Sequence, residues 1–312
     1  MKRRLFCVLI ALFCLVAPLS ACKSAPIPKR NGLAVSVLSV GQGDAVLITL
    51  PEGVVLIDGG GDAEFQKPFL SAVTGGGIDT LDYLIVTHPE RDHTAFLPAL
   101  LESVSVKTAY LPLIEKSETF VSFTKTAALL KERECTVRIT ALYDTFMVGE
   151  ARFVVLSPSS ADDPHGEYAA YARKETDTTN DLSAVVYMEY RDYRFLFAGD
   201  ASAAIEEKIL ARWESGLYHP FDVDLNGIHF LKVAHHGSAD ASSSDFLSLL
   251  KPTYAVVSVG AANSYGHPKD VTLSRLLDCG ATVYRTDFFG TVTASVTENG
   301  LEIINAFQAQ NG

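Results

Sequence analysis

The sequence has little cysteine, with five residues in 312. Cys7 and Cys14 lie in an apolar N-terminal run, and Cys22 follows soon after it. A framework of several disulfides, as in small secreted domains, is therefore excluded. Cys135 and Cys279 are the two that remain farther along the chain. Outside the cytoplasm they can pair or stay as buried thiols, and the sequence leaves both alternatives open.

Basic residues are also scarce. The chain has 26 lysines and arginines against 37 aspartates and glutamates, which gives a formal net charge of −11. Residues 1–21 hold three of the basic residues and no acidic one, so the remainder carries 23 against 37, near −14. This balance disfavours nonspecific binding of nucleic acid through a broad basic surface. Bound divalent metal would offset part of the charge.

One apolar run is long, Leu5–Val16, and it follows the basic residues Lys2–Arg4. No other segment is long and apolar enough to span a bilayer. Small residues precede Cys22, a pattern that resembles the lipobox of bacterial lipoproteins. The resemblance implies cleavage before Cys22 and lipidation there, which would anchor the protein on the extracytoplasmic face of a bacterial cell membrane. An uncleaved membrane anchor is the alternative.

This pattern divides the chain into three parts. We expect residues 1–21 to be a lipoprotein signal peptide, 22–32 to be a tether, and 33–312 to form the folded domain. Strand-like runs in that domain are interrupted by helix-like segments. We expect strands over 34–40, 44–50, 54–57, 81–86, 152–156, 184–190, 193–198, 228–234 and 254–259, a hairpin over 291–304, and helices over 94–101, 119–131, 203–213 and 244–250.

Two units within this pattern share the order strand, histidine, helix, strand. One spans residues 83–110 and the other spans residues 230–255. Two such halves facing each other would bring their histidines to one site. Chance similarity between strand–loop–helix units is the alternative.

The stretch Thr87–His93 holds two histidines and two acids between a predicted strand and a predicted helix. Open α/β sheets bind ligands at the ends of their strands. Histidine and carboxylate side chains are ligands for first-row metals, so His88, Glu90, Asp92 and His93 are candidates. A solvated polar loop is the alternative, and the metal interpretation therefore needs further ligands elsewhere.

Other strand ends supply such ligands: Asp58, Asp200, the pair His235 and His236, and His267 in a Gly-His-Pro turn. Each alone is more often structural. Together they lie at the ends of hydrophobic strands, where burying several carboxylates without a cation is costly. The set therefore predicts a metal centre.

In their order along the chain, these motifs resemble those of the metallo-β-lactamase superfamily, and more narrowly the hydrolase domain of ComEC-type competence proteins. The resemblance spans about residues 34–297 and rests on Val40–Asp44, Ile57–Gly60, Thr87–Pro89 with Asp92 and His93, Asn180 with Ser183, Ala198–Asp200, Lys232–Ser238, Tyr265–Pro268 and Tyr284–Asp287. It implies an α+β fold, an αββα metallo-β-lactamase sandwich with its site along one edge of two packed sheets.

The resemblance also implies one or two divalent ions, Zn or Mn, with Mg possible. The first metal site departs from the family pattern, because Glu90 replaces a histidine and the usual third histidine is missing. Asn180 and Ser183 lie in that part of the chain instead. The first site is thus reduced to His88, Glu90 and a shared Asp200.

The second site would comprise Asp92, His93, Asp200 and one histidine of the pair. His235 is preferred over His236 because it directly follows the predicted strand. Further roles are expected outside this ligand set. Asp58 would orient a histidine, and Asp44 would either do the same or be a ligand, with a catalytic role beside Asp92. His267 would protonate the leaving oxygen or bind a phosphate oxygen. Arg285 and Lys232 would contact phosphate, with simple exposure as the alternative for Lys232. His236 and Ser238 would support the ligands or bind the substrate.

The resemblance implies hydrolysis by a metal-bound water, with DNA phosphodiesters as the suspected substrate. It covers the hydrolase domain of the competence proteins and does not include their membrane channel. The sequence shows no feature that requires a protein partner. Two alternatives stay open. The acidic charge favours a hydrolase of another surface ester or phosphodiester, such as a phosphocholine-type substrate or a lactone. The depleted first site favours a non-catalytic lipoprotein that binds metal or DNA.

Overall fold

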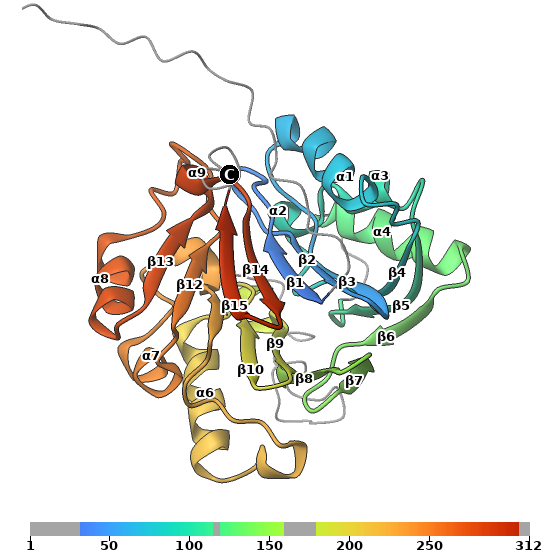
Figure 1. The fold of residues 1–312 in the computed structure, drawn as a ribbon. Coiled ribbons are helices and arrows are strands. Elements are labelled where there is room, and N and C mark those ends of the chain that lie inside the picture. Colours follow the sequence, from blue (N-terminus) through green and yellow to red (C-terminus); the bar gives the residue numbers. More distant parts are fainter. Residues whose placement is uncertain (1–31, 115–118, 159–178, 306–312) are drawn as a thin grey trace, which may run out of the picture.

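The computed structural model describes residues 32–114, 119–158 and 179–305 (Figure 1). The expected signal peptide, Cys22 and nearly all of the tether lie outside the described residues. Within the described ranges, no helix combines the length and apolar character needed to cross a bilayer. Cys135 and Cys279 are both described, and both are free, half-buried thiols, which resolves the alternative left open by the sequence.

Two mixed sheets pack face to face and helices cover their outer faces, which confirms the predicted αββα sandwich (Figure 1). The eight-stranded sheet has the order β15-β14-β1-β2-β3-β4-β5-β6 and the seven-stranded sheet β13-β12-β11-β10-β9-β8-β7. The strands are β1 (Leu33–Val37), β2 (Val46–Leu50), β3 (Gly53–Ile57), β4 (Thr80–Ile85), β5 (Ser105–Leu111), β6 (Thr136–Ile139), β7 (Thr145–Val148), β8 (Ala151–Ser157), β9 (Val185–Tyr190), β10 (Tyr193–Phe197), β11 (Phe230–Lys232), β12 (Tyr254–Val257), β13 (Thr282–Arg285), β14 (Val292–Thr297) and β15 (Gly300–Asn305).

The helices lie in two groups, one on each outer face. The first group comprises α1 (Gln66–Thr74), α2 (Arg91–Thr94), α3 (Leu97–Leu100) and α4 (Val121–Glu132), beside the eight-stranded sheet. The second comprises α6 (Ala203–Glu214), α7 (Ser244–Leu250) and α8 (Asp270–Asp278), beside the seven-stranded sheet, and the short α9 (Thr286–Phe289) follows β13.

Strand residues alternate between two hydrophobic cores, which explains why the strands are nearly continuous apolar runs. In β3, Val55 and Ile57 face the core between the sheets, whereas Val54 and Leu56 face the core beneath α1, α3 and α4. Successive side chains of a strand point to opposite faces, so a strand covered on both sides needs apolar residues at every position.

The two units with the order strand, histidine, helix, strand occupy equivalent places in the two sheets. β4 and β5 are parallel neighbours in one sheet, and β11 and β12 are parallel neighbours in the other. The segments that follow β4 and β11 therefore carry His88, His93, His235 and His236 to the same edge of the sandwich. This arrangement supports the internal repeat predicted from the sequence.

The helix expected over 94–101 is instead two short helices, α2 and α3. The Asp92 carbonyl accepts the N–H of Asp44 at 2.9 Å, and the N–H of Phe96 donates to Gly59 at 2.8 Å. These long-range bonds replace the helical bond between Asp92 and Phe96, and Pro98 has no N–H with which to continue the first helix. The loops after β1, β3 and β4 are thereby tied together beside the site.

Candidate metal centre

Asp92, His93, Asp200 and His236 form one compact cluster at the edge where β4, β10 and β11 end. Each offers a ligand atom, and these atoms all lie within 4.8 Å of one another. His93 Nε2 lies 3.3 Å from Asp200 Oδ1, and His236 Nε2 lies 3.4 Å from Asp92 Oδ2. The two histidines and Asp200 are buried, whereas the Asp92 side chain is 27% exposed. The cluster is therefore an enclosed site that solvent reaches from the side of Asp92.

Several buried atoms of this cluster and of neighbouring His88 have no hydrogen-bond partner among the described residues. They are the Nε2 atoms of His88, His93 and His236, and Oδ1 of Asp200. Buried polar atoms without partners cost free energy, and few native structures keep several of them side by side. A divalent cation would satisfy nitrogen and carboxylate atoms together, so the residues present fit a metal ion.

Two buried acceptors fix which nitrogen of each imidazole faces the cluster. His93 Nδ1 donates to Asp58 Oδ2 at 2.8 Å, and His236 Nδ1 donates to the Ser258 carbonyl at 2.9 Å. A carbonyl or carboxylate oxygen only accepts here, so Nδ1 carries the hydrogen and the Nε2 lone pair points to the cluster. This is the tautomer that metal ligation through Nε2 requires.

Asp58 lies behind His93 rather than among the converging atoms. It follows β3 and also accepts hydrogen bonds from the Thr87 N–H at 2.8 Å and the Thr87 hydroxyl at 2.7 Å. Burial raises the pKa of Asp58, and His93 partly offsets this effect. Its position is that of the orienting residue expected from the sequence.

The carboxylates of the cluster favour protonation of the histidine side chain that would bind a cation. Burial lowers the pKa of His93, but the carboxylates of Asp200 and Asp58 outweigh burial and hold this pKa well above its usual range. Burial raises the pKa of Asp200, but His93 and His236 outweigh it and hold that pKa well below its usual range. A metal ion would therefore compete with protons on the histidines and meet ionised carboxylates.

The geometry favours His236 over His235 as a member of the ligand set, which corrects the preference drawn from the sequence. β11 ends at Lys232, so neither histidine directly follows the strand. Both have left-handed backbones, with φ of 47° and 51°, in the short 3-10 turn Ala234–Gly237. This turn directs His236 inward, whereas His235 lies at the rim with 22% of its side chain exposed and its Nε2 3.9 Å from Asp200 Oδ2.

Only part of the expected first site comes together. His88 is fully buried beside the cluster, with Nε2 3.9 Å from Asp200 Oδ2, and burial with the help of His93 lowers its pKa to about 3. Glu90 instead accepts a hydrogen bond from the hydroxyl of Thr179 and is absent from the ligand clusters among the described residues.

Asn180 and Ser183, the two residues expected in place of a third histidine, act on the site indirectly. Ser183 Oγ accepts the N–H of Asp200 at 3.1 Å and lies 3.4 Å from His88 Nδ1. Asn180 Nδ2 lies 3.3 Å from His235 Nε2. Ser183 thus positions the loop of Asp200, and Asn180 positions the rim histidine.

His267 lies next to His235 at the rim, with ring centroids 5.6 Å apart. Its backbone N–H and carbonyl are both bonded to the side chain of Asn263, at 3.0 and 2.7 Å. Burial, with the charges of His235 and His236, lowers the pKa of His267 to about 4. His267 is therefore neutral near pH 7, which favours a role as a hydrogen-bond partner over the expected role as proton donor.

Two other residues expected near the substrate have structural partners. The Arg285 guanidinium donates to both carboxylate oxygens of Asp287, at 3.0 and 2.6 Å, and lies over the ring of Phe288. It is not free for phosphate, unlike the expectation. The Ser238 N–H donates to the His235 carbonyl at 2.8 Å and closes the histidine turn.

Lys232 is a buried member of the site whose surroundings the sequence did not indicate. It was expected to contact phosphate or to be exposed, but it is 1% exposed and donates to the Asp44 carboxylate and to the Gly199 carbonyl. Asp44 in turn lies 3.7 Å from His236 Nδ1 and 3.9 Å from His93 Nδ1. Asp44 therefore supports both imidazoles from behind. A charged residue inside an apolar strand was the one available hint.

Glycine allows the loops of the site to approach one another. A Cβ on Gly60 would collide with the backbone of Asp92 and His93, and a Cβ on Gly43 would collide with the Asp92 carbonyl. Any larger residue at these positions would push α2 away from β3. The Gly-rich turns are thus needed for the spacing of the metal ligands.

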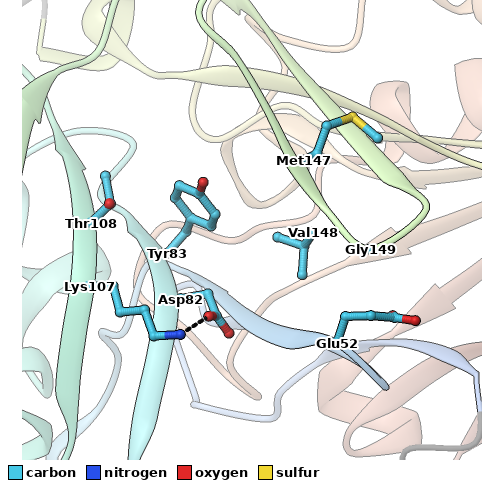
Figure 2. Close-up of a pocket in the computed structure, with 8 residues that line it drawn as sticks. All are labelled: Glu52, Asp82, Tyr83, Lys107, Thr108, Met147, Val148 and Gly149. Carbon is cyan, nitrogen blue, oxygen red and sulfur yellow. Dashed lines mark hydrogen bonds and ion pairs between the residues drawn. The ribbon is translucent and has the colours of Figure 1, made fainter.

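A cavity of about 240 Å³ lies at the edge of the sheets opposite to the metal cluster (Figure 2). It borders the start of β3 and the turn after β7, far along the strands from the metal cluster. Two of its charged groups are paired with each other, because Asp82 accepts from Lys107 Nζ at 2.7 Å, and Asp82 also accepts from the Val54 N–H at 2.8 Å. None of its lining residues has a buried side-chain polar atom without a hydrogen-bond partner in the described part of the chain, unlike the residues of the metal centre.

Comparisons with known proteins agree with this geometry. The family described as the metallo-beta-lactamase superfamily matches residues 38–261. ComE operon protein 3 of Bacillus subtilis (strain 168) is 29% identical over 278 residues, which cover 83% of this chain and 32% of that protein. Competence protein ComA of Neisseria gonorrhoeae is 25% identical over 275 residues, which cover 88% and 34%. The chain thus spans about a third of the length of these relatives.

A solved structure shows the same fold. CmlA, a diiron beta-hydroxylase from Streptomyces venezuelae, superposes with a TM-score of 0.51 at 15% identity, covering 86% of this chain and 54% of that one. At this level of identity the likeness establishes the fold alone.

Proposed function

Because the chain belongs to the metallo-beta-lactamase superfamily, we propose that it is a metal-dependent phosphodiesterase whose substrate is DNA. The observation that carries the proposal is the convergence of unpartnered histidine nitrogens on the buried carboxylate of Asp200. The choice of DNA is supported by the similarity to a protein named for competence, the uptake of DNA.

The ion would be held by Asp92, His93, Asp200 and His236, with His88 beside Asp200 as the start of a second position. Zn, Mn or Mg all suit this mixed set of nitrogen and oxygen donors. A bound divalent ion supplies a water of lowered pKa as nucleophile and stabilises the charge that develops on the phosphoryl oxygens.

The chain's own residues orient the reaction. Asp58 and the Ser258 carbonyl hold the imidazoles of His93 and His236, so the ligand atoms are in place before substrate binds. His267 lies beside His235 at the rim, and its neutral ring has one N–H to donate to a phosphate oxygen. The partly exposed Asp92 marks the side from which the diester enters.

The test is metal content and DNA cleavage on the purified chain, for wild type and for Asp92→Ala. We expect at least one tightly bound ion and cleavage of linear single-stranded DNA that the substitution abolishes. Asp278→Ala removes an exposed carboxylate at the end of α8 and is the matched control. Bound metal without cleavage of DNA would contradict the proposal and favour a binding lipoprotein.

A second candidate substrate is a phosphocholine-type ester or another small surface diester. The formal charge of −11 favours it, because long nucleic acids are repelled by an acidic surface. Faster turnover of p-nitrophenyl phosphorylcholine than of DNA by the same preparation would favour this candidate.

We also propose that the protein is lipid-anchored at Cys22 on the extracytoplasmic face of a bacterial membrane. The support is the basic, apolar and small-residue pattern of residues 2–22. Cys22→Ser should release the protein from the membrane fraction, whereas Cys135→Ser should leave it there. A Cys22→Ser protein that stays in the membrane, with residues 1–21 retained, would indicate an uncleaved anchor.

A further inference from the structure

A hollow of about 570 Å³ lies beside the metal centre, between the segment α2–α3 and the start of α4. β4 and β5 are parallel neighbours, so both end at the same edge of their sheet. The metal loop follows β4, and α4 follows the connection that leaves β5. The start of α4 and the hollow therefore lie at the edge that carries the metal centre, unlike the cavity of Figure 2.

One short helix separates the hollow from the metal cluster. α2 contributes Asp92 and His93 to the cluster, whereas Arg91 and Ala95 line the hollow. The hydroxyls of Thr94 and Ser122 lie 2.6 Å apart, and this hydrogen bond ties α2 to the first turn of α4. An extended ligand bound at the cluster needs to pass only one turn of helix to reach the hollow.

Two cations border the hollow and have no acidic partner in the described part of the chain. Arg91 and Lys125 are both exposed, and neither forms an ion pair with any described residue. Some other basic groups are held by carboxylates, as Arg285 is by Asp287 and Lys107 is by Asp82. Glu102 is the one acid along the described lining, so the local balance is positive in a protein of charge −11.

An aromatic residue, Phe120, directly precedes α4 and lines the hollow together with the two cations. Phe120 lines the hollow and is only partly buried against the core beneath α4. Single-stranded nucleic acid binds through cations that follow its backbone and through aromatic rings on which its bases stack. The hollow offers both elements at the edge where the scissile phosphate would bind.

We propose that this hollow binds the part of a single-stranded polynucleotide next to the scissile phosphate. Arg91 and Lys125 each contact a backbone phosphate, and Phe120 stacks on a base. This inference rests on the proposed DNA phosphodiesterase function and names the subsite that lets an acidic protein hold DNA. A small diester fills the metal centre without reaching the two cations, so the hollow selects for chain length.

The experiment measures binding of a fluorescein-labelled 20-nucleotide single strand to the full chain by fluorescence anisotropy, in EDTA so that no cleavage occurs. The salt concentration is varied. Each of Arg91→Ala and Lys125→Ala should weaken binding about fivefold at low salt. Each should also reduce the slope of log K against log salt by about 0.7, the value for one phosphate contact on a single strand. Lys131→Ala removes an exposed cation from the same helix outside the hollow and should change neither quantity.

The outcomes separate this inference from the proposed function. If Arg91→Ala/Lys125→Ala binds with the wild-type affinity and slope, the hollow is not the subsite, even where cleavage depends on Asp92. If binding depends on both cations but the metal-loaded protein cleaves no DNA, the hollow is a binding site for the strand and the phosphodiesterase proposal is contradicted. If wild type hydrolyses a small diester but does not bind the strand, the proposal that the hollow binds a polynucleotide is wrong, whereas the metal-dependent hydrolysis is retained.

Discussion

Lys232 and Asp44 join the two sheets behind the metal centre. Lys232 ends β11 of the seven-stranded sheet, and its ammonium donates to the carboxylate of Asp44, which precedes β2 of the eight-stranded sheet. Both side chains are nearly inaccessible to solvent. Since Asp44 also lies within 4 Å of His93 and His236, the packing of the sheets and the geometry of the metal ligands depend on the same ion pair.

Lys232→Met should lower the free energy of unfolding by about 3 kcal/mol, because removing one partner of a buried pair leaves the other uncompensated. Urea unfolding monitored by circular dichroism measures this change. Adding Asp44→Asn to Lys232→Met should recover part of the loss, since the stranded carboxylate is then gone. Lys131→Met, at an exposed position of α4, is the control. A Lys232→Met protein as stable as wild type would mean that the pair contributes nothing.

Removal of metal should lower the melting temperature. A ligand that binds only the folded state at about 100 times its Kd stabilises it by about 2.7 kcal/mol. We therefore expect wild type to lose stability in EDTA and to regain it with Zn or Mn, as differential scanning calorimetry would show. Asp200→Asn should remove this response, because Asp200 lies at the centre of the cluster. Equal melting temperatures with and without metal would count against the site.

The fold was predictable because its strands are covered on both faces and appear as apolar runs at every position. The histidine-bearing loops were predictable because histidines and carboxylates at the ends of several hydrophobic strands are costly to bury together without a bound cation. The choice between His235 and His236 was not, since it depends on two consecutive left-handed residues that no local pattern specifies.

Contacts between distant residues explain the remaining differences. The ion pair of Lys232 and Asp44 joins positions 188 residues apart. The break between α2 and α3 depends on hydrogen bonds from Asp44 and to Gly59, which lie in other loops. Glu90 was expected at the metal but is bonded to Thr179, whose position only the folded chain defines.

Asp58→Ala should weaken metal binding about 10- to 100-fold, the usual effect of losing a carboxylate that orients a metal-ligating histidine. His93 would lose the acceptor that keeps its hydrogen on Nδ1, so its Nε2 lone pair would no longer be fixed toward the cluster. Competition with a chromophoric chelator measures the affinity. Asp58→Asn retains an oxygen acceptor and should lose less affinity. Equal metal affinity in wild type and Asp58→Ala would assign Asp58 to the stability of the loop instead.

His229 should make the fold sensitive to mild acid at a place away from the metal centre. Its Nδ1 accepts the N–H of Arg194 at 3.1 Å, which requires the neutral ring. Burial, together with Arg194, lowers the pKa of His229. The unfolded chain then binds the proton more readily than the folded one, so stability is complete above the ordinary histidine pKa of about 6.5 and falls as pH decreases below it.

We expect the contribution to be about 0.5 kcal/mol, since one hydrogen bond is involved and the ring is only half-buried. His229→Asn keeps an acceptor near the position of Nδ1 and does not titrate in this range. Urea unfolding at pH 7.5 and 5.5 should therefore show a smaller loss for His229→Asn than for wild type, whereas His219→Asn, at an exposed histidine, should behave as wild type does. The same loss in all three proteins would place the acid sensitivity at other groups, with His88 and His267, whose pKa values are also lowered, first among them.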